Sequence, residues 1–506
     1  MSSFSLIAND YINPSIAFLI GKNGLFKMGI IINILEFFSA NKRAKSKIFT
    51  LRSFHALIWL TLASGLTLGL SFGGPVQAAT FTVTKTADTA DGNCDADCSL
   101  REAILAANAS PGADTIHLPN GTYTLSIVGG DEDASTTGDL DITDDLTIIG
   151  VSAANTIIDG AEIDRVFEVD PVGAGVVVDI SHVTVKNGSA PDNYDFVIVR
   201  TSGGGIHNLG ILTLTDVIIS GNKAIYFGYG GGLHNVGTAN LVAVRVSGNM
   251  GYRGGGIGNL GTLTVVDCVL SDNTASGGIG GGGGLRNGGT AEIRNTTLSG
   301  NEVVGYNGGG IENTSILNVF NSTVSGNKAR VHGGGIANFN LAWLANVTIA
   351  DNIATAGQGG GVYTSVETVF ENTLLSYNTA SGIKNNCHLQ QGSGHFTDYG
   401  YNLEDSNTCG FASTGDVIDT DPLLGTLKDN GGPTPTHALL PGSPAIDGGN
   451  PEGCSDMEPG TYLSTDQRGF LRPADGNRDS IPVCDIGAYE YVPSKAMPWL
   501  LLLLDN

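Results

Sequence analysis

Acidic side chains in a glycine-containing loop are the residues of this sequence best suited to chemistry. Residues 475–479 read Asp-Gly-Asn-Arg-Asp, and Asp485 follows shortly after. Ca²⁺ prefers such oxygen ligands, and Gly and Asn favour a tight loop around an ion. Calcium is therefore a candidate cofactor, with Asp475, Asn477, Asp479 and Asp485 as its ligands. The alternative is a solvated acidic loop that keeps the protein soluble.

Two further acidic stretches fit no metal motif. One surrounds the first cysteines and contains Asp88, Asp91, Asp95 and Asp97, and the other contains Asp131, Glu132, Asp133, Asp139, Asp141, Asp144 and Asp145. Neither has the EF-hand spacing or the nonapeptide calcium repeat. We interpret both stretches as solvated acid.

Histidine and the basic residues form no recurring catalytic pattern. His207 and His234 share one position of a repeat, but later copies have Gly258, Arg286 and Glu312 there. We interpret the two histidines as part of a polar turn. Zinc spacing is absent, because the Cys94-x₃-Cys98 pair has no second pair or His nearby. The sequence therefore predicts no catalytic residues and, calcium apart, no cofactor.

Charge is distributed unevenly along the chain. The sequence has 49 acidic and 25 basic residues and a net charge of −24, but residues 1–78 are basic. Within them a basic segment, 41–47, precedes an apolar run, 56–72, and Val76-Gln-Ala78 fits a cleavage site. This order predicts a secretory signal peptide, with a membrane anchor as the alternative, and residues 1–40 fit a start site placed too far upstream. The acidic remainder argues against nucleic acid as a partner.

Six of the seven cysteines fall into close pairs, which export would allow to form disulfides. The predicted pairs are Cys94 with Cys98, Cys387 with Cys409, and Cys454 with Cys484. Cys268 remains, in a repeat position that is Val in other copies, and we predict a buried free thiol there.

A repeat that begins with three glycines fixes the architecture. It starts at Gly203, Gly230, Gly254, Gly282, Gly308, Gly333 and Gly359, and an Asn follows 19 residues after each start. Apolar residues alternate within the block, as in Leu212 and Leu214, which indicates short strands with one face inward. A rigid block of this size with a connector of variable length predicts a parallel β-solenoid.

Two series of asparagines recur in these repeats and are predicted to stack as amide ladders at turns. The alternative is a polar row that binds a glycan. The first series is Asn208, Asn235, Asn259, Asn287, Asn313 and Asn338, and the second is Asn222, Asn249, Asn273, Asn301, Asn327, Asn352 and Asn378.

A short helix is predicted to cover the open N-terminal end of the solenoid. Ser99 and Glu102 form a capping box, and Leu100, Ala103 and Ile104 fall on one helical face. Such a helix would protect the unpaired edge of the first coil.

The chain resembles known families at three places. Cys98-Ser-Leu-Arg-Glu-Ala103 resembles the CSLREA domain of exported bacterial proteins, and the Gly-Gly-Gly-Ile repeats are similar to those of polymorphic outer-membrane proteins. Segments between 421 and 490, including Leu440-Pro-Gly-Ser-Pro-Ala-Ile-Asp447 and Cys484-Asp-Ile-Gly-Ala-Tyr-Glu490, resemble the choice-of-anchor Q module. The layout is similar to right-handed parallel β-helices of the pectin-lyase type. The resemblance implies a surface-displayed protein, although the apolar tail at 492–506 is short for an anchor.

The enzymes of that fold carry motifs that this sequence lacks. It has no Gly-His-Gly, no Asn-Thr-Asp and no Arg-x-Pro-x-x-Arg. We therefore expect a non-enzymatic, secreted or cell-surface protein, associated with the outer membrane if anchored, that contacts an extracellular glycan or an envelope or host component. The alternative is a polysaccharide lyase, hydrolase or epimerase with its site in the stretches 189–201 or 383–414. Asp192, Tyr194, Asp195 and Arg200 of the first stretch would then line a cleft.

These observations predict an all-β protein, a right-handed parallel β-helix with an N-terminal capping helix and a small C-terminal module. The predicted boundaries are 1–78 for the leader, 79–113 for the cap, 114–202 for irregular first coils and 203–380 for the seven repeats. A disulfide-containing coil or loop at 381–415, a module at 416–491 and a tail at 492–506 follow.

Overall fold

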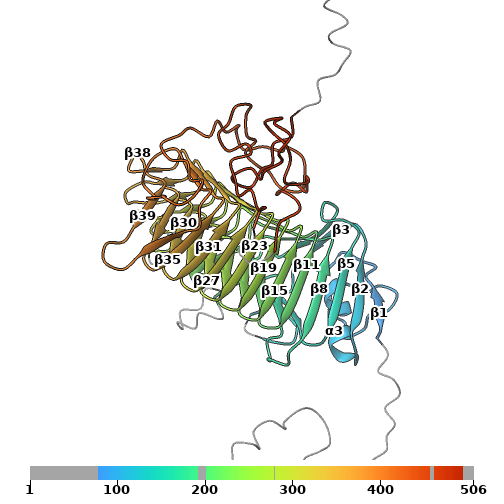
Figure 1. Cartoon of the computed structure of the whole chain (residues 1–506). Helices are drawn as coiled ribbons and strands as arrows, with labels where there is room; N and C mark the ends of the chain where they lie inside the picture. Colours follow the sequence, from blue (N-terminus) through green and yellow to red (C-terminus); the bar gives the residue numbers. More distant parts are fainter. Residues whose placement is uncertain (1–77, 131, 192–200, 279, 456–460, 494–506) are drawn as a thin grey trace, which may run out of the picture. The chain divides into compact units, whose positions relative to one another are not determined.

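The computed structural model describes residues 78–130, 132–191, 201–278, 280–455 and 461–493 (Figure 1). The chain divides into two units, 1–74 and 75–506, and the described residues all belong to the second. Residues 1–77 of the predicted leader and the tail from 494 lie outside this description, as do the residues predicted to line a cleft, Asp192, Tyr194, Asp195 and Arg200. Within the described ranges no helix is both long and apolar enough to cross a membrane.

The chain forms a parallel β-helix, as predicted, in which successive coils add strands to stacked sheets (Figure 1). Each of the seven regular repeats contributes one strand to each of four sheets, whereas the described residues of the first coils contribute to only three. Sheet A has 12 strands, in the order β1 (Thr80–Thr82), β2 (Asp114–Leu118), β5 (Leu146–Gly150), β8 (Val177–Ser181), β11 (Ile211–Thr215), β15 (Thr238–Val242), β19 (Thr262–Val266), β23 (Thr290–Arg294), β27 (Ile316–Phe320), β31 (Leu341–Ala345), β35 (Glu367–Glu371) and β40 (His395–Asp398).

Sheet B has 11 strands, in the order β3 (Gly121–Thr124), β6 (Thr156–Asp159), β9 (Thr184–Lys186), β12 (Ile218–Ser220), β16 (Arg245–Ser247), β20 (Val269–Ser271), β24 (Thr297–Ser299), β28 (Thr323–Ser325), β32 (Thr348–Ala350), β36 (Leu374–Ser376) and β41 (Leu403–Glu404).

Sheet C has 10 strands, which from the N-terminal end are β4 (Leu140–Ile142), β7 (Phe167–Val169), β10 (Ile206–Asn208), β14 (Leu233–Asn235), β18 (Ile257–Asn259), β22 (Leu285–Asn287), β26 (Ile311–Asn313), β30 (Ile336–Asn338), β34 (Val362–Thr364) and β39 (Cys387–Leu389).

Sheet D has eight strands built from the connectors between repeats, in the order β13 (Lys223–Tyr229), β17 (Met250–Arg253), β21 (Thr274–Ala275), β25 (Glu302–Val303), β29 (Lys328–Ala329), β33 (Ile353–Ala354), β37 (Thr379–Ala380) and β38 (Ile383–Lys384). Only the last pair, β37 with β38, is antiparallel among the described pairings of this sheet.

Equivalent residues of successive coils stack directly, because the repeat block has constant length. One apolar column inside sheet A consists of fully buried side chains, Leu214, Leu241, Val265, Ile293, Val319, Leu344 and Phe370. The glycine triplets allow the chain to turn close to its neighbour. Gly308 has φ +70°, and a Cβ on Gly309 would lie 2.3 Å from the carbonyl oxygen of Gly334.

Both asparagine series form side-chain ladders in the buried interior. Asn208 Nδ2 donates to Asn235 Oδ1 at 2.7 Å, and the first ladder ends where Asn338 Nδ2 donates to Thr364 Oγ1 at 3.2 Å. In the second ladder Asn249 Nδ2 donates to Asn273 Oδ1 at 3.0 Å. Each amide therefore links two coils in a region that water does not reach.

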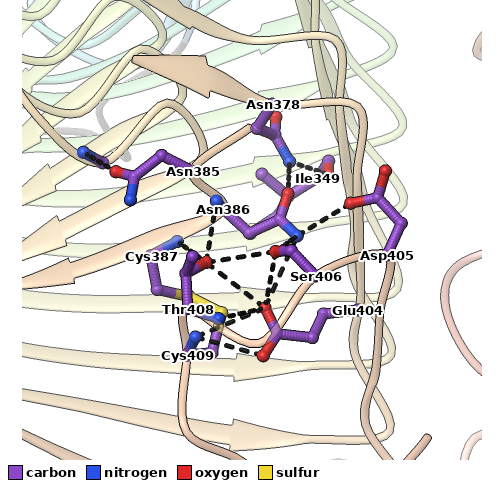
Figure 2. The surroundings of a disulfide bond; sticks show 11 residues. Ile349, Asn378, Asn385, Asn386, Cys387, Glu404, Asp405, Ser406, Thr408 and Cys409 are labelled. Atoms are coloured by element: carbon purple, nitrogen blue, oxygen red, sulfur yellow. Dashed lines mark hydrogen bonds between the residues drawn. A yellow bond between two sulfur atoms is a disulfide. The ribbon is translucent and has the colours of Figure 1, made fainter. Parts of the chain in front are cut away.

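The second ladder ends beside a disulfide (Figure 2). Asn378 Nδ2 donates to Asn386 Oδ1 at 3.0 Å, and the buried Glu404 carboxylate accepts the backbone N–H of Cys409 at 3.1 Å. Cys409 is bonded to Cys387. Residues 381–415 thus form a further coil, since they supply β39, β40 and β41 to sheets C, A and B.

The other two predicted pairs are also disulfides, Cys94–Cys98 and Cys454–Cys484. Cys268 is free and fully buried. Burial raises the pKa of its thiol to about 12, which keeps it protonated and unreactive at neutral pH.

The predicted helix is α3 (Leu100–Ala109). Ser99 Oγ accepts the backbone N–H of Glu102 at 3.1 Å, while Glu102 Oε2 accepts the backbone N–H of Ser99 at 2.8 Å. Leu100, Ala103 and Ile104 are buried in the same core as the first coils.

The C-terminal module packs against the outer face of sheet B. In β24 and β28, Thr297 and Thr323 are fully buried by it, and both contact the side chain of Gln467. Asn321, on a corner with φ +49°, receives a hydrogen bond from the guanidinium of Arg472 at 3.2 Å. Leu439, Ala445 and Ile486 of the module form a small apolar core together with Leu374 of β36 and Leu403 of β41.

Candidate functional site

A row of charged side chains lies on the first strands of sheet C. Asp141 in β4 is paired in register with Glu168 in β7, Glu168 with His207 in β10, and His207 with His234 in β14. Each is the middle residue of a three-residue strand, so its side chain points away from the core that its two neighbours face. The period-two pattern of the strands thus directs four titratable groups to one side of the sheet.

Connecting segments bring three more charged groups to this row. Arg165 Nε donates to Asp139 Oδ2 at 2.7 Å, and Arg165 Nη2 donates to Glu168 Oε2 at 2.7 Å. Asp164 Oδ1 accepts the backbone N–H of Arg165 at 2.7 Å. We refer to Asp139, Asp141, Asp164, Arg165, Glu168, His207 and His234 as the acid–histidine cluster. None of its seven residues is more than 7% exposed.

Hydrogen bonds orient the members of the cluster. His207 Nδ1 lies 2.8 Å from Glu168 Oε1. Asp141 Oδ2 accepts the backbone N–H of Ser135 at 2.7 Å, and Ser135 Oγ accepts the backbone N–H of Asp141 at 2.6 Å. The rings of His207 and His234 are stacked with centroids 5.0 Å apart.

The helix α3 holds the segment that carries Asp139. The buried guanidinium of Arg101 donates to the carbonyl oxygens of Ser135, Gly138 and Asp139 at 2.8–3.0 Å. The same guanidinium pairs with the Asp88 carboxylate at 2.8 Å. The helix that covers the first coil therefore also positions the cluster.

Burial dominates the electrostatics of the cluster. Burial and the nearby charge of Asp139 raise the pKa of Asp141 to about 8 and that of Asp164 to about 7. Burial also raises the pKa of Asp139, although Arg165 opposes this effect. Burial and the neighbouring His207 lower the pKa of His234 well below its usual value, so His234 is neutral.

Several polar atoms of the cluster have no hydrogen-bond partner. They are Asp141 Oδ1, Asp164 Oδ2, His207 Nε2 and both ring nitrogens of His234. Buried polar atoms are normally satisfied, so each unpaired atom calls for a physical explanation. The cluster concentrates several charged groups, but its side chains are too deeply buried to contact a polymer chain. It suits a proton or a small ion.

The row continues along sheet C with different side chains. Arg286 Nε in β22 lies 3.0 Å from Glu312 Oε2 in β26, and Tyr363 in β34 stacks between His332 and His388 at 4.3 and 5.8 Å. The interpretation of His207 and His234 as a polar turn is wrong, because both lie in strands. The interpretation of Asp139 and Asp141 as solvated acid is also wrong, because both are buried, and sequence reasoning missed Glu168.

The residues predicted to bind calcium lie at two different places. Asp475, Asn477 and Asp479 share one exposed turn, in which Asp475 Oδ1 and Asn477 Oδ1 both accept the backbone N–H of Asp479. Asp485 is buried, and its Oδ1 accepts the backbone N–H of Asp447 at 2.7 Å. Asp447 in turn accepts the backbone N–H of Asn477 at 2.6 Å, so it organises the turn that sequence reasoning assigned to an ion.

A second candidate surface is the outer face of sheet A. Its central row consists of stacked, half-exposed side chains, which are Thr213, Asn240, Thr264, Glu292, Asn318 and Trp343. Exposed aliphatic residues flank the row, among them Ile211 and Ile316, which are 42% and 41% exposed. Arg294 lies over the Phe320 ring at 4.4 Å. The face presents hydroxyl, amide and aromatic groups at the spacing of one strand, about 4.8 Å.

Comparisons with known proteins yield similarity of fold. No family model and no curated protein sequence matches the chain. Among solved structures, a pectate lyase, Pel9A, matches with a TM-score of 0.43 and 15% identity, covering 83% of this chain and 98% of that one. The pectin methylesterase PemA from Erwinia chrysanthemi has a TM-score of 0.28 and 14% identity, covering 68% of this chain and 93% of that one. The A-module of the mannuronan C-5 epimerase AlgE6 from Azotobacter vinelandii has a TM-score of 0.27 and 15% identity, covering 63% and 99%.

Proposed function

We propose that this chain is an exported, non-catalytic β-helix that binds an extended polysaccharide along the outer face of sheet A. It would act at the cell surface or outside the cell, where it contacts a glycan of the envelope or of a host. The central row of sheet A carries this proposal. Its polar side chains repeat in register over five coils, with Trp343 in the sixth, as the hydroxyl groups of a linear glycan repeat along the polymer.

The side chains of the row suit sugars. Thr213, Asn240 and Asn318 offer hydroxyl and amide groups that donate and accept hydrogen bonds. Trp343 adds a half-exposed aromatic ring with an apolar face and one N–H donor. Glu292 is the acidic member of the row, so a neutral glycan would meet less repulsion there than an acidic one.

Export is supported by the cysteines and by the terminal motifs. Three disulfides within the described residues are compatible with an oxidising compartment. The resemblance of 98–103 to the CSLREA domain and of 421–490 to the choice-of-anchor Q module supports display at a surface. Catalysis at the acid–histidine cluster is disfavoured, because its side chains are buried away from any polymer.

The test incubates the full-length chain with a panel of acidic and neutral polysaccharides. Binding is measured by affinity electrophoresis, and products are measured as new reducing ends and unsaturated uronates. We expect retardation by at least one polysaccharide with no product. New reducing ends or uronates would instead establish a hydrolase or lyase, and a change in uronate stereochemistry an epimerase.

Two variants locate the binding surface. Trp343→Ala is expected to weaken binding about tenfold, which corresponds to about 1.4 kcal/mol. Tyr462→Ala removes an aromatic residue of the C-terminal module that is 53% exposed, and binding should be unchanged. Equal affinity of the wild type and Trp343→Ala would place the glycan elsewhere.

A further inference from the structure

We propose that the acid–histidine cluster is a calcium site whose protein ligands are the carboxylates of Asp139, Asp141 and Glu168. This inference is independent of the glycan proposal and assigns the ion to a place other than the turn at 475–479. It rests on the separation of the oxygen atoms, on unpaired buried atoms and on the chemistry of the donors.

The three carboxylates are close enough to share one ion. One oxygen from each lies within 4.8 Å of the other two, and all three residues are buried. Ca²⁺–O distances are about 2.3–2.6 Å, so two ligands on opposite sides of the ion are about 4.6–5.2 Å apart. Separations up to 4.8 Å therefore suit Ca²⁺ without movement of the strands.

Unpaired buried oxygen atoms point independently to a cation as their partner. Asp141 is 0% exposed and its Oδ1 has no partner, although Ser135 occupies Oδ2. Asp164, which is 2% exposed, likewise has an unpaired Oδ2. An unpaired buried carboxylate oxygen is costly, and a cation would satisfy it directly.

The donors favour calcium over other metals. Three carboxylates form an all-oxygen set, which suits Ca²⁺, Mg²⁺ and Mn²⁺ better than Zn²⁺. Mg²⁺ retains several waters and demands octahedral geometry at shorter distances, whereas Ca²⁺ accepts irregular sets. His207 contacts Glu168 through Nδ1 and acts as an orienting partner of that ligand.

Surrounding contacts hold the ligands in place before an ion arrives. Arg165 contacts one oxygen of Asp139 and one of Glu168. Each carboxylate has about four lone-pair sites, so the guanidinium and an ion can share these groups. Arg101 fixes the backbone that carries Asp139. An ion here would join the segment held by α3 to strands β4 and β7.

The experiment measures metal content and thermal stability of the full-length chain. Protein purified in Ca²⁺ is passed through metal-free buffer, and calcium is counted by atomic emission. The wild type should retain about one calcium ion per chain and should melt at a lower temperature after it is unfolded and refolded with EDTA. Asp141→Asn keeps the shape of the side chain but removes its charge, and should retain no calcium.

Asp479→Asn, in the exposed turn, is the matched control and should retain calcium like the wild type. Calcium in the wild type no higher than in Asp141→Asn would overturn the proposal, as would its loss in Asp479→Asn. A terbium soak of wild-type crystals decides the position without any variant. An anomalous peak among Asp139, Asp141 and Glu168 supports the site, and a peak elsewhere or none contradicts it.

Discussion

Arg101 Nη1 donates a hydrogen bond to the carbonyl oxygen of Asp139 at 3.0 Å. The two residues belong to different structures, the capping helix and the segment leading into β4. Arg101 thereby connects the motif at 98–103 with the buried charges of the acid–histidine cluster. The motif therefore does more than form the helix, because its Arg101 also holds the backbone segment 135–139 that carries part of the acid–histidine cluster.

Replacement of Arg101 is expected to destabilise the N-terminal end strongly. Arg101→Ala would leave the Asp88 carboxylate, whose side chain is 3% exposed, without its buried partner, at a cost of about 3–5 kcal/mol. Arg101→Lys retains the charge but not the paired geometry of the guanidinium, so its stability should lie between those of the wild type and Arg101→Ala. Urea unfolding measures both. A loss below about 1 kcal/mol in Arg101→Ala would show that the contact is unimportant.

Acid is expected to weaken the cap through Glu102. Burial alone would raise the pKa of Glu102, but hydrogen bonds from Ser99, Thr89 and Asp91 and the charge of Lys85 lower it to about 2. A carboxyl with a lowered folded-state pKa stabilises the fold above its unfolded value, here 4.5, and loses this effect as the pH falls towards 2.

The melting temperatures of the wild type and Glu102→Gln, measured from pH 7 to pH 2, test this prediction. The difference should be constant above about pH 4.5 and shrink towards pH 2. A difference in melting temperature that is independent of pH would mean that folding does not change the pKa of Glu102.

Loss of a buried ladder asparagine should reduce the stability of the fold far more than loss of a half-exposed asparagine. Asn273 Oδ1 accepts both the backbone N–H and the Nδ2 of Asn249, and Asn273 Nδ2 donates to the carbonyl oxygen of Val246. Asn273→Ala would leave these buried groups unpaired, at about 1–3 kcal/mol each. Asn318→Ala, on the half-exposed face of sheet A, should cost less than about 0.5 kcal/mol.

Guanidinium denaturation of both variants gives the comparison. Because solenoids unfold repeat by repeat, hydrogen exchange of the flanking coils should show the loss centred on β16, β20 and β24. Similar stabilities of the two variants would rule out a structural role for the ladder.

The glycine triplets should tolerate alanine at few positions. At Gly309 a new Cβ would meet the carbonyl oxygen of Gly334 at 2.3 Å and backbone atoms of Lys328 at 2.6 Å, so Gly309→Ala should cost about 3 kcal/mol or prevent folding. Gly326 has φ +65° but open space around it, and Gly326→Ala should cost only about 1–2 kcal/mol. The melting temperature of Gly309→Ala should be lower than that of Gly326→Ala. The reverse result would contradict the close stacking of Gly309 on Gly334.

Most of the fold could be predicted from the sequence because each coil of a solenoid carries the same sequence pattern. The triple glycines and the two asparagine series recur at fixed positions, and residues at equal positions stack, so Asn235 contacts Asn208 and Asn259. The capping box of Ser99 and Glu102 is likewise local, within one helical turn. Each of these features depends only on residues in the same turn or in the adjacent coil, so a local sequence pattern predicts it.

The acid–histidine cluster could not be predicted in this way. Asp139 and Arg165 are separated by 26 residues and Glu168 and His207 by 39. Asp139, Arg165 and Glu168 come from the irregular first coils, where no repeat fixes the register, and only the histidines lie in the regular repeats. The alternation of β4 and β7 predicts which way their side chains point, but not that loops would cover them. Burial of Thr297 and Thr323 by Gln467 has the same origin, because these residues are more than 140 positions apart.

The sequence by itself determined the parallel β-helix and its ladders, since both follow from a pattern repeated in every coil. It also indicated the capping helix and the disulfide pairs, since the residues involved lie close together in the chain. Only the tertiary structure decided which charged groups became buried together and which face of the helix stayed open. Those outcomes depend on how segments distant in sequence cover the sheets: segment 135–139 and α3 close over the first strands of sheet C, the C-terminal module packs on sheet B, and the central row of sheet A remains half-exposed.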